Sequence, residues 1–303
     1  MDLVSYWEEK KKLLDEALRR AIRGEEAEAI DVARYIVEGG KRFRGILVLL
    51  TAEALGGDPL DALNAAVAVE LVHASSLAID DIVDRDTVRR GQPAAWIMHG
   101  IAKTVLVSNY LIPLAQKMVE KYGFEAVRHT IRAWLDVTRG EILDVFVSSK
   151  TPYNPGLYRR ITELKTGSLF RLSINLGLAA AGKSGEGYEE FSEYGLLLGI
   201  AYQVADDIVD LKLVSEGALE EWPPVLALAA SWMLGRKAEL PRDAEEAYRA
   251  GIVKLRTIVS MASEKASILP VNKYSDLLSE IPGFMAEKML GEAGLSLGVS
   301  LKP

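Results

Sequence analysis

The sequence predicts an all-α fold, and three features of the chain support this prediction. Apolar residues recur at three- and four-residue spacing nearly throughout, which is the period of an amphipathic helix. No convincing alternating strand appears, and no Asn-Gly or Asp-Gly pair joins two β-branched runs. Glycines and prolines interrupt the periodic stretches at helix-length intervals. We therefore predict one domain, residues 1–303, built as a bundle of about ten to twelve helices.

The individual helices are expected between these interruptions. The clearest amphipathic stretches are Trp7–Ile22, Ala126–Val147 and Ala247–Ala266. The breaks fall at Gly39-Gly40, Gly56-Gly57, Gly91 with Pro93, Gly123, Pro152 with Pro155, Gly182 to Gly187, Pro223-Pro224, Pro241, and Pro282-Gly283. Short polar loops join the stretches, and no linker or low-complexity tract separates them.

Composition excludes several classes of protein. The chain has 303 residues and is 49% hydrophobic, which is enough to fill a large core. A net charge of −7 argues against a nucleic-acid partner. The chain contains no cysteine, so disulfides, zinc-thiolate sites and thiol nucleophiles are excluded.

No targeting or membrane segment is expected. The first residues are charged at once and do not resemble a signal peptide. No run approaches the ~18 uninterrupted apolar residues of a transmembrane helix. We predict a soluble, cytoplasmic protein.

The pentapeptide DDIVD occurs twice, at Asp80–Asp84 and at Asp206–Asp210, and each copy ends a largely apolar stretch. On a helix, the first and last aspartates of a copy are one turn and ~40° apart, and the second lies ~100° from the first. Carboxylates placed this close repel one another and lose hydration if they face the core. Cations between them would remove this cost. Carboxylate oxygens without His or Cys suit Mg²⁺, which usually brings a phosphate-bearing substrate.

A single copy would equally fit a solvated helix end, but two identical copies favour a shared site. If the two helices face each other across the bundle, metal ligands line opposite walls of one cavity. An apolar cavity capped by divalent metal ions suits a hydrophobic substrate that carries a phosphate group.

Basic and polar residues from several segments form a set of cations and donors for two anionic groups. The GGKRFRG segment supplies Lys41, Arg42 and Arg44 after a glycine pair. Arg89 and Arg90 follow the first motif, and Arg can hold phosphate oxygens with two donors. Four further residues are candidates. His73 lies two turns before Asp80, and Gln203 lies one turn before Asp206. Lys165 and Thr166 are adjacent on a mostly apolar helix.

With these residues assembled, the sequence resembles the trans-isoprenyl diphosphate synthases, or polyprenyl synthetases, of the archaeal geranylgeranyl and geranylfarnesyl type. GGKRFR is similar to the family's GGKRxRP, and LVHASSLAIDDIVDRDTVRRGQP to its first aspartate-rich region. KTGSLF is similar to KTxxL, GIAYQVADDIVD to GxxxQxxDDxxD, and GEILD, more weakly, to GQxxD. The resemblance covers about Gly39 to Asp210.

The resemblance implies the isoprenoid synthase fold, in which helices surround a central apolar cavity, and usually a homodimer. It implies that Asp80 and Asp84 hold two Mg²⁺ ions and Asp206 a third, supported by Asp81, Asp207 and Asp210. The allylic diphosphate would contact Arg89, Lys165, Thr166 and Gln203, and isopentenyl diphosphate would contact Lys41, Arg44, His73 and Arg90. Loss of the allylic diphosphate would expose a carbocation, which the isopentenyl double bond attacks.

The chain departs from the family pattern at three places. Gly45 stands where a proline is usual, which we expect to be harmless, and VSNYL replaces a frequent Gly-Asp pair. After the second motif the chain lacks the family's Gly-Lys pair, and Lys212 is the one lysine there that could substitute.

The family resemblance also bears on product length, because side chains just before the first motif form the pocket floor. Here those positions hold the small Ser75 and Ser76, so the growing tail should pass Ser76. Val72, one turn further down, is a candidate for the floor. We expect a product of at least twenty carbons, and a length of twenty-five carbons is among those expected.

Two other functions stay open at this point. A class I terpene cyclase uses similar metal chemistry, although its second motif usually ends in Ser or Thr and then Glu. The altered segment after Asp210 also allows a non-catalytic subunit that binds a prenyl diphosphate within a heteromeric synthase. A purely structural bundle gives no reason for two acidic motifs.

Overall fold

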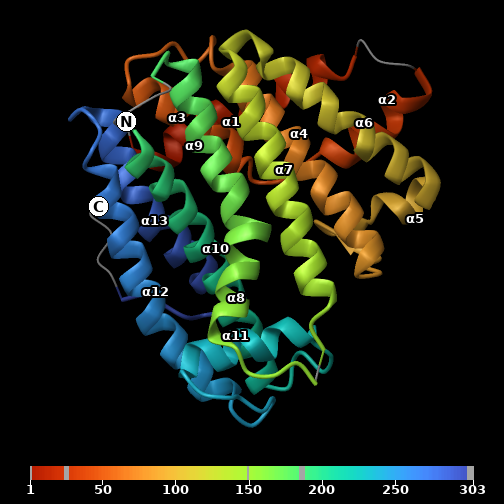
Figure 1. The fold of residues 1–303 in the computed structure, drawn as a ribbon, viewed down its shortest axis with the longest axis vertical. Helices are drawn as coiled ribbons and strands as arrows, with labels where there is room; N and C mark the ends of the chain where they lie inside the picture. Colours follow the sequence, from red (N-terminus) through yellow and green to blue (C-terminus); the bar gives the residue numbers. More distant parts are fainter. Residues whose placement is uncertain (1, 24–26, 149, 184–187, 299–303) are drawn as a thin grey trace. The chain divides into compact units, whose positions relative to one another are not determined.

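The computed structural model describes residues 2–23, 27–148, 150–183 and 188–298 of the chain (Figure 1). These residues form thirteen α-helices, one 3₁₀ turn, one π-helical turn and a single short β-hairpin. The prediction of an all-α fold is therefore confirmed. The hairpin, Val88–Arg89 with Gln92–Pro93, has two residues per strand and was not predicted.

The chain divides into two compact units. Unit 1 consists of Met1–Trp134, Leu172–Tyr188 and Asn272–Tyr274. Unit 2 consists of Leu135–Arg171, Glu189–Val271 and Ser275–Pro303. The boundaries fall inside helices α7, α9 and α13, so each of these helices contributes residues to both units.

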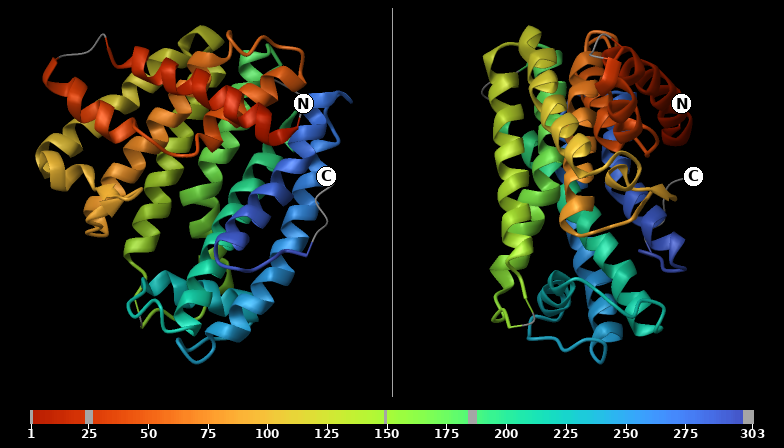
Figure 2. Two further views of the ribbon diagram at one scale, coloured as in Figure 1. Left: turned by 180° about the vertical axis from the view of Figure 1, so that it is seen from behind. Right: turned by 90° about the vertical axis from the view of Figure 1, so that its right-hand side faces the viewer.

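Unit 1 is built around α3, which is buried on every side from Arg44 to Ala54. Helix α4 packs against α3 and α6, and α1 and α2 also contact α4 (Figure 2). The helices of this unit are α1 (Leu3–Ala21), α2 (Ala27–Val37), α3 (Phe43–Ala54), α4 (Leu63–Val83), α5 (Ala95–His99), α6 (Ile101–Val119) and the first turns of α7 (Phe124–Val145), which follow the 3₁₀ turn η1 (Glu120–Tyr122). The apolar turns of α4 are buried up to Val72, so the helix is anchored before its acidic end begins.

Unit 2 is centred on α10, which packs along α12 and against the π-helical turn η2. Gly251 of α12 makes this contact close, because an added Cβ would lie 2.8 Å from Cγ1 of Ile208. The elements of this unit are the second half of α7, α8 (Pro155–Thr162), η2 (Glu163–Gly167), the first turn of α9 (Ser168–Ala180), α10 (Glu189–Ser215), α11 (Pro224–Leu234), α12 (Ala244–Ala266) and α13 (Lys273–Glu292) from Ser275 onward, whereas most of α9 belongs to unit 1. The second acidic motif therefore lies on the most extensively packed helix of its unit.

Three glycines allow backbones to approach the π-helical turn η2. A Cβ at Gly140 of α7 would lie 2.5 Å from the amide nitrogen of Lys165. A Cβ at Gly199 of α10 would lie 2.6 Å from the Cα of Gly167, and one on Gly167 would meet Leu196 at the same distance. Only residues without a side chain fit such approaches. The π-turn is thereby held between α7 and α10.

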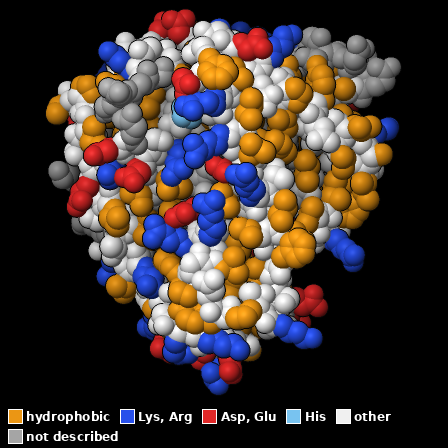
Figure 3. All heavy atoms as spheres, viewed as in Figure 1, with side chains coloured by type: hydrophobic (Ala, Val, Ile, Leu, Met, Phe, Trp, Pro, Cys, Tyr) orange, Lys and Arg blue, Asp and Glu red, His pale blue; other side chains and the backbone are white. Residues whose placement is uncertain are grey.

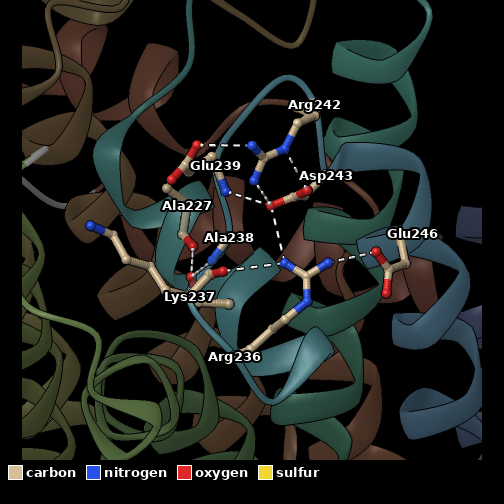
Figure 4. A network of polar contacts seen from close by, with 9 residues as sticks. Ala227, Arg236, Lys237, Ala238, Glu239, Arg242, Asp243 and Glu246 are labelled. Atoms are coloured by element: carbon tan, nitrogen blue, oxygen red, sulfur yellow. Dashed lines mark hydrogen bonds and ion pairs between the residues drawn. The ribbon is translucent and has the colours of Figure 1, made fainter.

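The connection between α11 and α12 is fixed by one buried carboxylate (Figure 4). Asp243 accepts hydrogen bonds from the backbone N–H of Glu239 at 2.8 Å and from the guanidinium groups of Arg236 and Arg242. These donors hold the pKa of the Asp243 carboxyl well below its usual range, the Arg242 hydrogen bond contributing most. Arg236 also donates to Glu246 of α12 at 2.6 Å. These hydrogen bonds and ion pairs therefore hold the connection between α11 and α12 against the start of α12.

Proline positions agree with the predicted breaks except at one place. Pro155 and Pro224 begin α8 and α11, where a missing N–H costs nothing. The predicted break at Pro282-Gly283 is wrong, because α13 continues through both residues. Pro282 and its neighbours Ile281 and Gly283 are buried, and this packing offsets the backbone hydrogen bond that a proline removes.

None of the described helices combines the length and the apolar run that crossing a bilayer requires.

Gly45 lies at a crowded contact of α3 with α1 and α4. Its backbone N–H donates to Oε1 of the buried Glu70 at 2.8 Å. A Cβ at this position would lie 2.3 Å from Cδ2 of Leu14 and 3.0 Å from Cγ of Glu70. A proline could not donate this hydrogen bond, so the glycine is required by the packing of this chain.

We predict that Gly45→Ala lowers the free energy of unfolding by about 1–3 kcal/mol, because the methyl group overpacks the contact with Leu14. Urea-induced unfolding measures this change. Gly291→Ala is the matched control, since Gly291 lies in α13 with no atom within 4 Å of an added Cβ. That variant should be neutral or slightly stabilising. Equal stability of the two variants would show that the crowding at Gly45 is relieved at no cost.

Candidate functional site

The first acidic motif forms the carboxyl end of α4. Asp84 caps the helix, and its backbone N–H donates to the carbonyl oxygen of Asp80 at 2.8 Å. Asp80 is half-buried, with its Oδ1 atom inaccessible to solvent, and Asp84 is exposed one turn later on the same edge of the helix. The carboxyl end of a helix carries partial negative charge, which disfavours further anions. The outer pair of this motif is thus an unfavourable arrangement that a bound cation would relieve.

Asp81, the inner residue of this motif, points in another direction. It is 2% exposed and accepts a hydrogen bond from Nε of Arg89 at 2.6 Å. Burial raises the pKa of Asp81, although the Arg89 guanidinium opposes the rise. Arg89 also reaches Asp86 at 3.2 Å. Arg89, predicted to contact the allylic diphosphate, is thus paired with two carboxylates in this structure.

The glycine pair of GGKRFR forms a seat for Arg90. Gly39 and Gly40 have φ of 74° and 89°, which side-chain-bearing residues rarely adopt. Nη1 of Arg90 donates to the carbonyl oxygen of Glu38 at 2.6 Å, and a Cβ on Gly40 would lie 3.0 Å from the guanidinium carbon. The two basic segments predicted from the sequence therefore meet at this turn.

Left-handed backbone is concentrated in the same region. Among the described residues, the non-glycine residues with positive φ are Arg42, Arg85 and Arg90, at 57°, 61° and 55°. Such conformations cost free energy and persist where surrounding contacts enforce them, often at functional sites. For Arg42 the contacts are Asp15 at 2.7 Å and the carbonyl oxygen of Val37 at 2.7 Å, so this arginine holds α1 to the turn before α3.

Arg44 and His73 come together across α3 and α4. Nη1 of Arg44 lies 3.1 Å from Nε2 of His73. A guanidinium only donates, so Nε2 accepts and the neutral ring carries its proton on Nδ1. Burial lowers the pKa of His73 well below its usual value, and the positive charges of Arg44, Arg90, Arg42 and Arg89 lower it further. Lys41 is exposed, and its carbonyl oxygen accepts from the indole of Trp7 at 3.0 Å.

The second acidic motif lies within α10, which continues to Ser215 beyond it. Asp206 is exposed and Asp210 is half-buried, again one turn apart on one edge. Asp207 is 7% exposed, with one oxygen accepting from the hydroxyl of Tyr158 and the other from Nε2 of Gln203 at 3.2 Å. Burial raises the pKa of Asp207 to about 7. Burial also raises the pKa of Asp210.

The π-helical turn η2 directs two consecutive side chains to two different helices. Thr166 donates to Oε1 of Gln203 on α10 at 2.7 Å. Lys165 pairs with Glu141 at 2.9 Å and with Asp144 at 2.8 Å, both on α7. π-turns are rare and frequent at functional sites. The lysine and threonine of the KTGSLF segment, Gln203 and the GEILD segment are thus joined in unit 2.

The structure places Lys212 away from the acidic edge of α10. Two residues after Asp210, it projects ~200° around the helix from that residue. Its ammonium group pairs with Glu216, one turn further on. Lys212 is therefore badly placed to replace the missing Gly-Lys pair.

The three residues predicted to bound the product chain lie on α4 with different exposures. Val72 and Ser75 are fully buried in the packing of the unit. Ser76 is half-buried, and its hydroxyl donates to the carbonyl oxygen of His73 at 2.8 Å. Of the three, Ser76 is the accessible side chain and lies one turn before Asp80.

Sequence reasoning missed Tyr158 and did not anticipate the partners of Lys165. Tyr158 contacts Asp207 across 49 residues of sequence, and no motif marks it. Glu141 and Asp144 lie in the weak GEILD segment, whose i and i+3 spacing puts both carboxylates on one helix face.

The donor set in each unit fits a hard divalent cation. Each motif separates into a buried inner aspartate, which accepts hydrogen bonds from the protein, and an outer pair of which one residue is half-buried and the other exposed. Carboxylate oxygens are the ligands that Mg²⁺ prefers. The outer residues Asp80, Asp84, Asp206 and Asp210 are therefore the candidates for metal binding.

Comparison with known proteins identifies relatives over nearly the whole chain. The family model for polyprenyl synthetases matches residues 26–218. A hexaprenyl pyrophosphate synthase of Saccharolobus solfataricus is 34% identical over 297 residues, covering 97% of this chain and 99% of the relative. A geranylfarnesyl diphosphate synthase of Methanosarcina mazei is 37% identical and covers 83% of each chain. The solved geranylgeranyl pyrophosphate synthetase of Pyrococcus horikoshii superposes with a TM-score of 0.80 at 26% identity, covering 94% of this chain and 98% of that one.

The lowered pKa of His73 predicts a pH-dependent stability. Below the ordinary value of 6.5, the histidine takes up a proton in the unfolded chain but stays neutral in the folded one. The stabilisation is therefore complete above pH 6.5 and is lost as pH falls toward the folded pKa, by at most about 1.4 kcal/mol per pH unit.

Urea unfolding of the wild type and of His73→Gln between pH 5 and pH 8 checks this prediction. The glutamine keeps an acceptor for Arg44 but does not titrate. The variant should lose stability less steeply as pH falls. Parallel curves for the two proteins would contradict the assignment of a neutral, buried His73.

Proposed function

Because this chain belongs to the polyprenyl synthetase family and is an enzyme of the trans-polyprenyl diphosphate synthase type, we propose that it condenses isopentenyl diphosphate with an allylic diphosphate. The product is a linear all-trans prenyl diphosphate of twenty or more carbons. Relatives named for hexaprenyl, geranylfarnesyl and geranylgeranyl products support this range. The observation that carries the proposal is the division of both DDIVD motifs into a buried inner aspartate and a more exposed outer pair.

Asp80 and Asp84 are proposed to hold two Mg²⁺ ions, and Asp206 a third, with Asp81, Asp207 and Asp210 in support. When bound, the ions supply positive charge that stabilises the diphosphate as a leaving group. In this proposal residues 1–303 act as one polyprenyl synthetase domain.

The residues of unit 1 are proposed to bind isopentenyl diphosphate. Arg44 and Arg90 provide guanidinium groups that grip phosphate oxygens with two donors each. His73 is neutral, so its Nδ1–H donates without adding charge. Lys41 is exposed beside them and adds a flexible ammonium group.

The residues of unit 2 are proposed to bind the allylic diphosphate together with Arg89. Thr166 donates to Gln203 and Gln203 donates to Asp207, so one chain of hydrogen bonds fixes the orientation of these side chains. Lys165 is held by Glu141 and Asp144 until the more highly charged diphosphate attracts it. The same exchange applies to Arg89, which Asp81 and Asp86 hold in this structure.

The reaction then depends on positioning and charge. The cationic side chains stabilise the departing diphosphate, and the allylic carbon becomes a cation. The isopentenyl double bond, held nearby by its own diphosphate, attacks that carbon. The proton lost in the last step goes to the departing diphosphate. Apolar walls exclude water, which would otherwise quench the cation.

A homodimer is the proposed assembly, and exposed apolar stripes support it. Hydrophobic side chains gather at the surface over α5 and α6 (Figure 3). On α6 Leu106 is 69% exposed, and on α7 Phe124, Ile131, Leu135 and Ile142 follow one helical face with exposures of 43–78%. Such stripes are unusual on a monomer and fit a self-complementary interface.

A non-catalytic subunit of a heteromeric synthase is the second candidate. It is favoured by the segment after Asp210, where Lys212 is paired with Glu216 and the following residues include Glu220 and Glu221 but no lysine or arginine up to Pro224. In that case a partner chain would supply the missing cation.

Purified protein incubated with Mg²⁺, isopentenyl diphosphate and a series of allylic primers tests the proposal. We expect elongation to products of twenty or more carbons, sized by chromatography, and loss of turnover when Mg²⁺ is chelated. Light scattering on the same sample gives the assembly. Binding of a prenyl diphosphate without turnover would support the subunit, and a cyclic hydrocarbon would indicate a terpene cyclase.

Ser76→Phe is expected to shorten the product. An aromatic ring one turn before Asp80, at the accessible position of α4, would block the path of the growing tail. Ser76→Ala is the control, because it removes the hydroxyl but leaves the position small. The product distributions are compared by chromatography, and an unchanged length in the phenylalanine variant would show that the floor lies elsewhere.

A further inference from the structure

The inner aspartates of the two identical pentapeptides are held in chemically different ways. Asp81 is paired with the cation of Arg89, whereas Asp207 accepts hydrogen bonds from the neutral groups of Tyr158 and Gln203. Both aspartates are nearly inaccessible, at 2% and 7% exposure. Each carboxylate therefore depends on its protein partners to replace lost hydration.

Tyr158 is a rigid donor for Asp207. It is 2% exposed on α8, and its ring lies 5.2 Å from the ring of Trp232 on α11. Lys254 of α12 lies 4.9 Å above the indole of Trp232. Aromatic packing from a second helix thus fixes where the tyrosine hydroxyl points.

The hydrogen bond of Tyr158 orders a directed chain of groups. With one oxygen of Asp207 engaged by Tyr158, the other accepts from the amide nitrogen of Gln203. The amide oxygen of Gln203 is then turned toward Thr166, whose hydroxyl donates to it at 2.7 Å. The orientation of Asp207 thereby determines the orientation of two residues proposed to hold the diphosphate.

We propose that Tyr158 is a positioning residue of the second acidic motif. Through its hydrogen bond to Asp207, Tyr158 fixes the rotation of the DDIVD turn of α10 about the helix axis, and so the direction in which the carboxylates of Asp206 and Asp210 point. Through the same aspartate it fixes the orientation of the Gln203 and Thr166 side chains. This inference rests on the proposed function, because it assigns Tyr158 to the same site.

The test compares Tyr158→Phe with Tyr194→Phe. Tyr194 is a matched control, because it is also fully buried in unit 2 and donates one hydrogen bond, to the carbonyl oxygen of Leu278 at 2.6 Å. Loss of a buried hydroxyl should lower the melting temperature of both variants to a similar extent. If the role of Tyr158 is purely structural, the lower melting temperature will be its only effect.

Two further readouts report positioning. The first is Mn²⁺ binding, followed by electron paramagnetic resonance. Every protein in this measurement also carries Asp80→Asn and Asp84→Asn, which remove the outer carboxylates of the first motif, so the signal reports binding at the second motif. Tyr158→Phe should weaken Mn²⁺ binding about tenfold or more, because groups that orient the metal ligands through hydrogen bonds contribute that much to metal affinity. Tyr194→Phe should keep the Mn²⁺ affinity within about twofold of the protein with both tyrosines. In the otherwise unaltered enzyme, Tyr158→Phe should lower kcat about tenfold with little change in KM for isopentenyl diphosphate.

Mn²⁺ affinity and kcat that match those of Tyr194→Phe would overturn the inference. That result differs from a failure of the proposed function. If the proposed function is wrong, the protein that keeps both Tyr158 and Tyr194 would neither bind Mn²⁺ at the second motif nor elongate a prenyl diphosphate.

Discussion

Repulsion between neighbouring carboxylates on a single helix edge is the constraint on which the rest of the structure depends. Each DDIVD motif places three carboxylates within five residues, and burial would make their charges more costly still. In both units the inner aspartate is turned into the protein and given donors, and the outer pair is less buried. Protein donors thus satisfy the inner carboxylate of each motif, and the more exposed outer pair is suited to a divalent cation.

The surroundings of each motif serve this division by different means. In unit 1, Arg42 and Arg90 have left-handed backbone and lie at the glycine turn, where the Arg90 guanidinium contacts Gly40. In unit 2, glycines bring α7 and α10 against a π-helical turn, which sends Lys165 and Thr166 to opposite neighbours. Cations and hydrogen-bond donors are thus placed near carboxylates in both units. In unit 1 strained backbone conformations achieve this, and in unit 2 the close approach of backbones does.

Sequence reasoning predicted the all-α fold, most helix boundaries and the two acidic motifs, because these depend on local periodicity and spacing. It failed where distant residues decide the outcome. The helix through Pro282 depends on burial of that segment, and Tyr158 reaches Asp207 across 49 residues. The short hairpin at Val88 was missed because two residues per strand leave no alternating pattern. Arg42 and Arg44 look equivalent in sequence, yet Arg42 is bound by Asp15 and Arg44 contacts His73.

A crystal structure with Mn²⁺ and inorganic pyrophosphate, read from the anomalous signal of the metal, tests the central claim most directly. The account predicts manganese ions ligated by Asp80 and Asp84 and by Asp206, all contacting one pyrophosphate, with Asp81 and Asp207 still bonded to Arg89 and Tyr158. Manganese on the two motifs with no phosphate in common, or ligated by the inner aspartates, would contradict it.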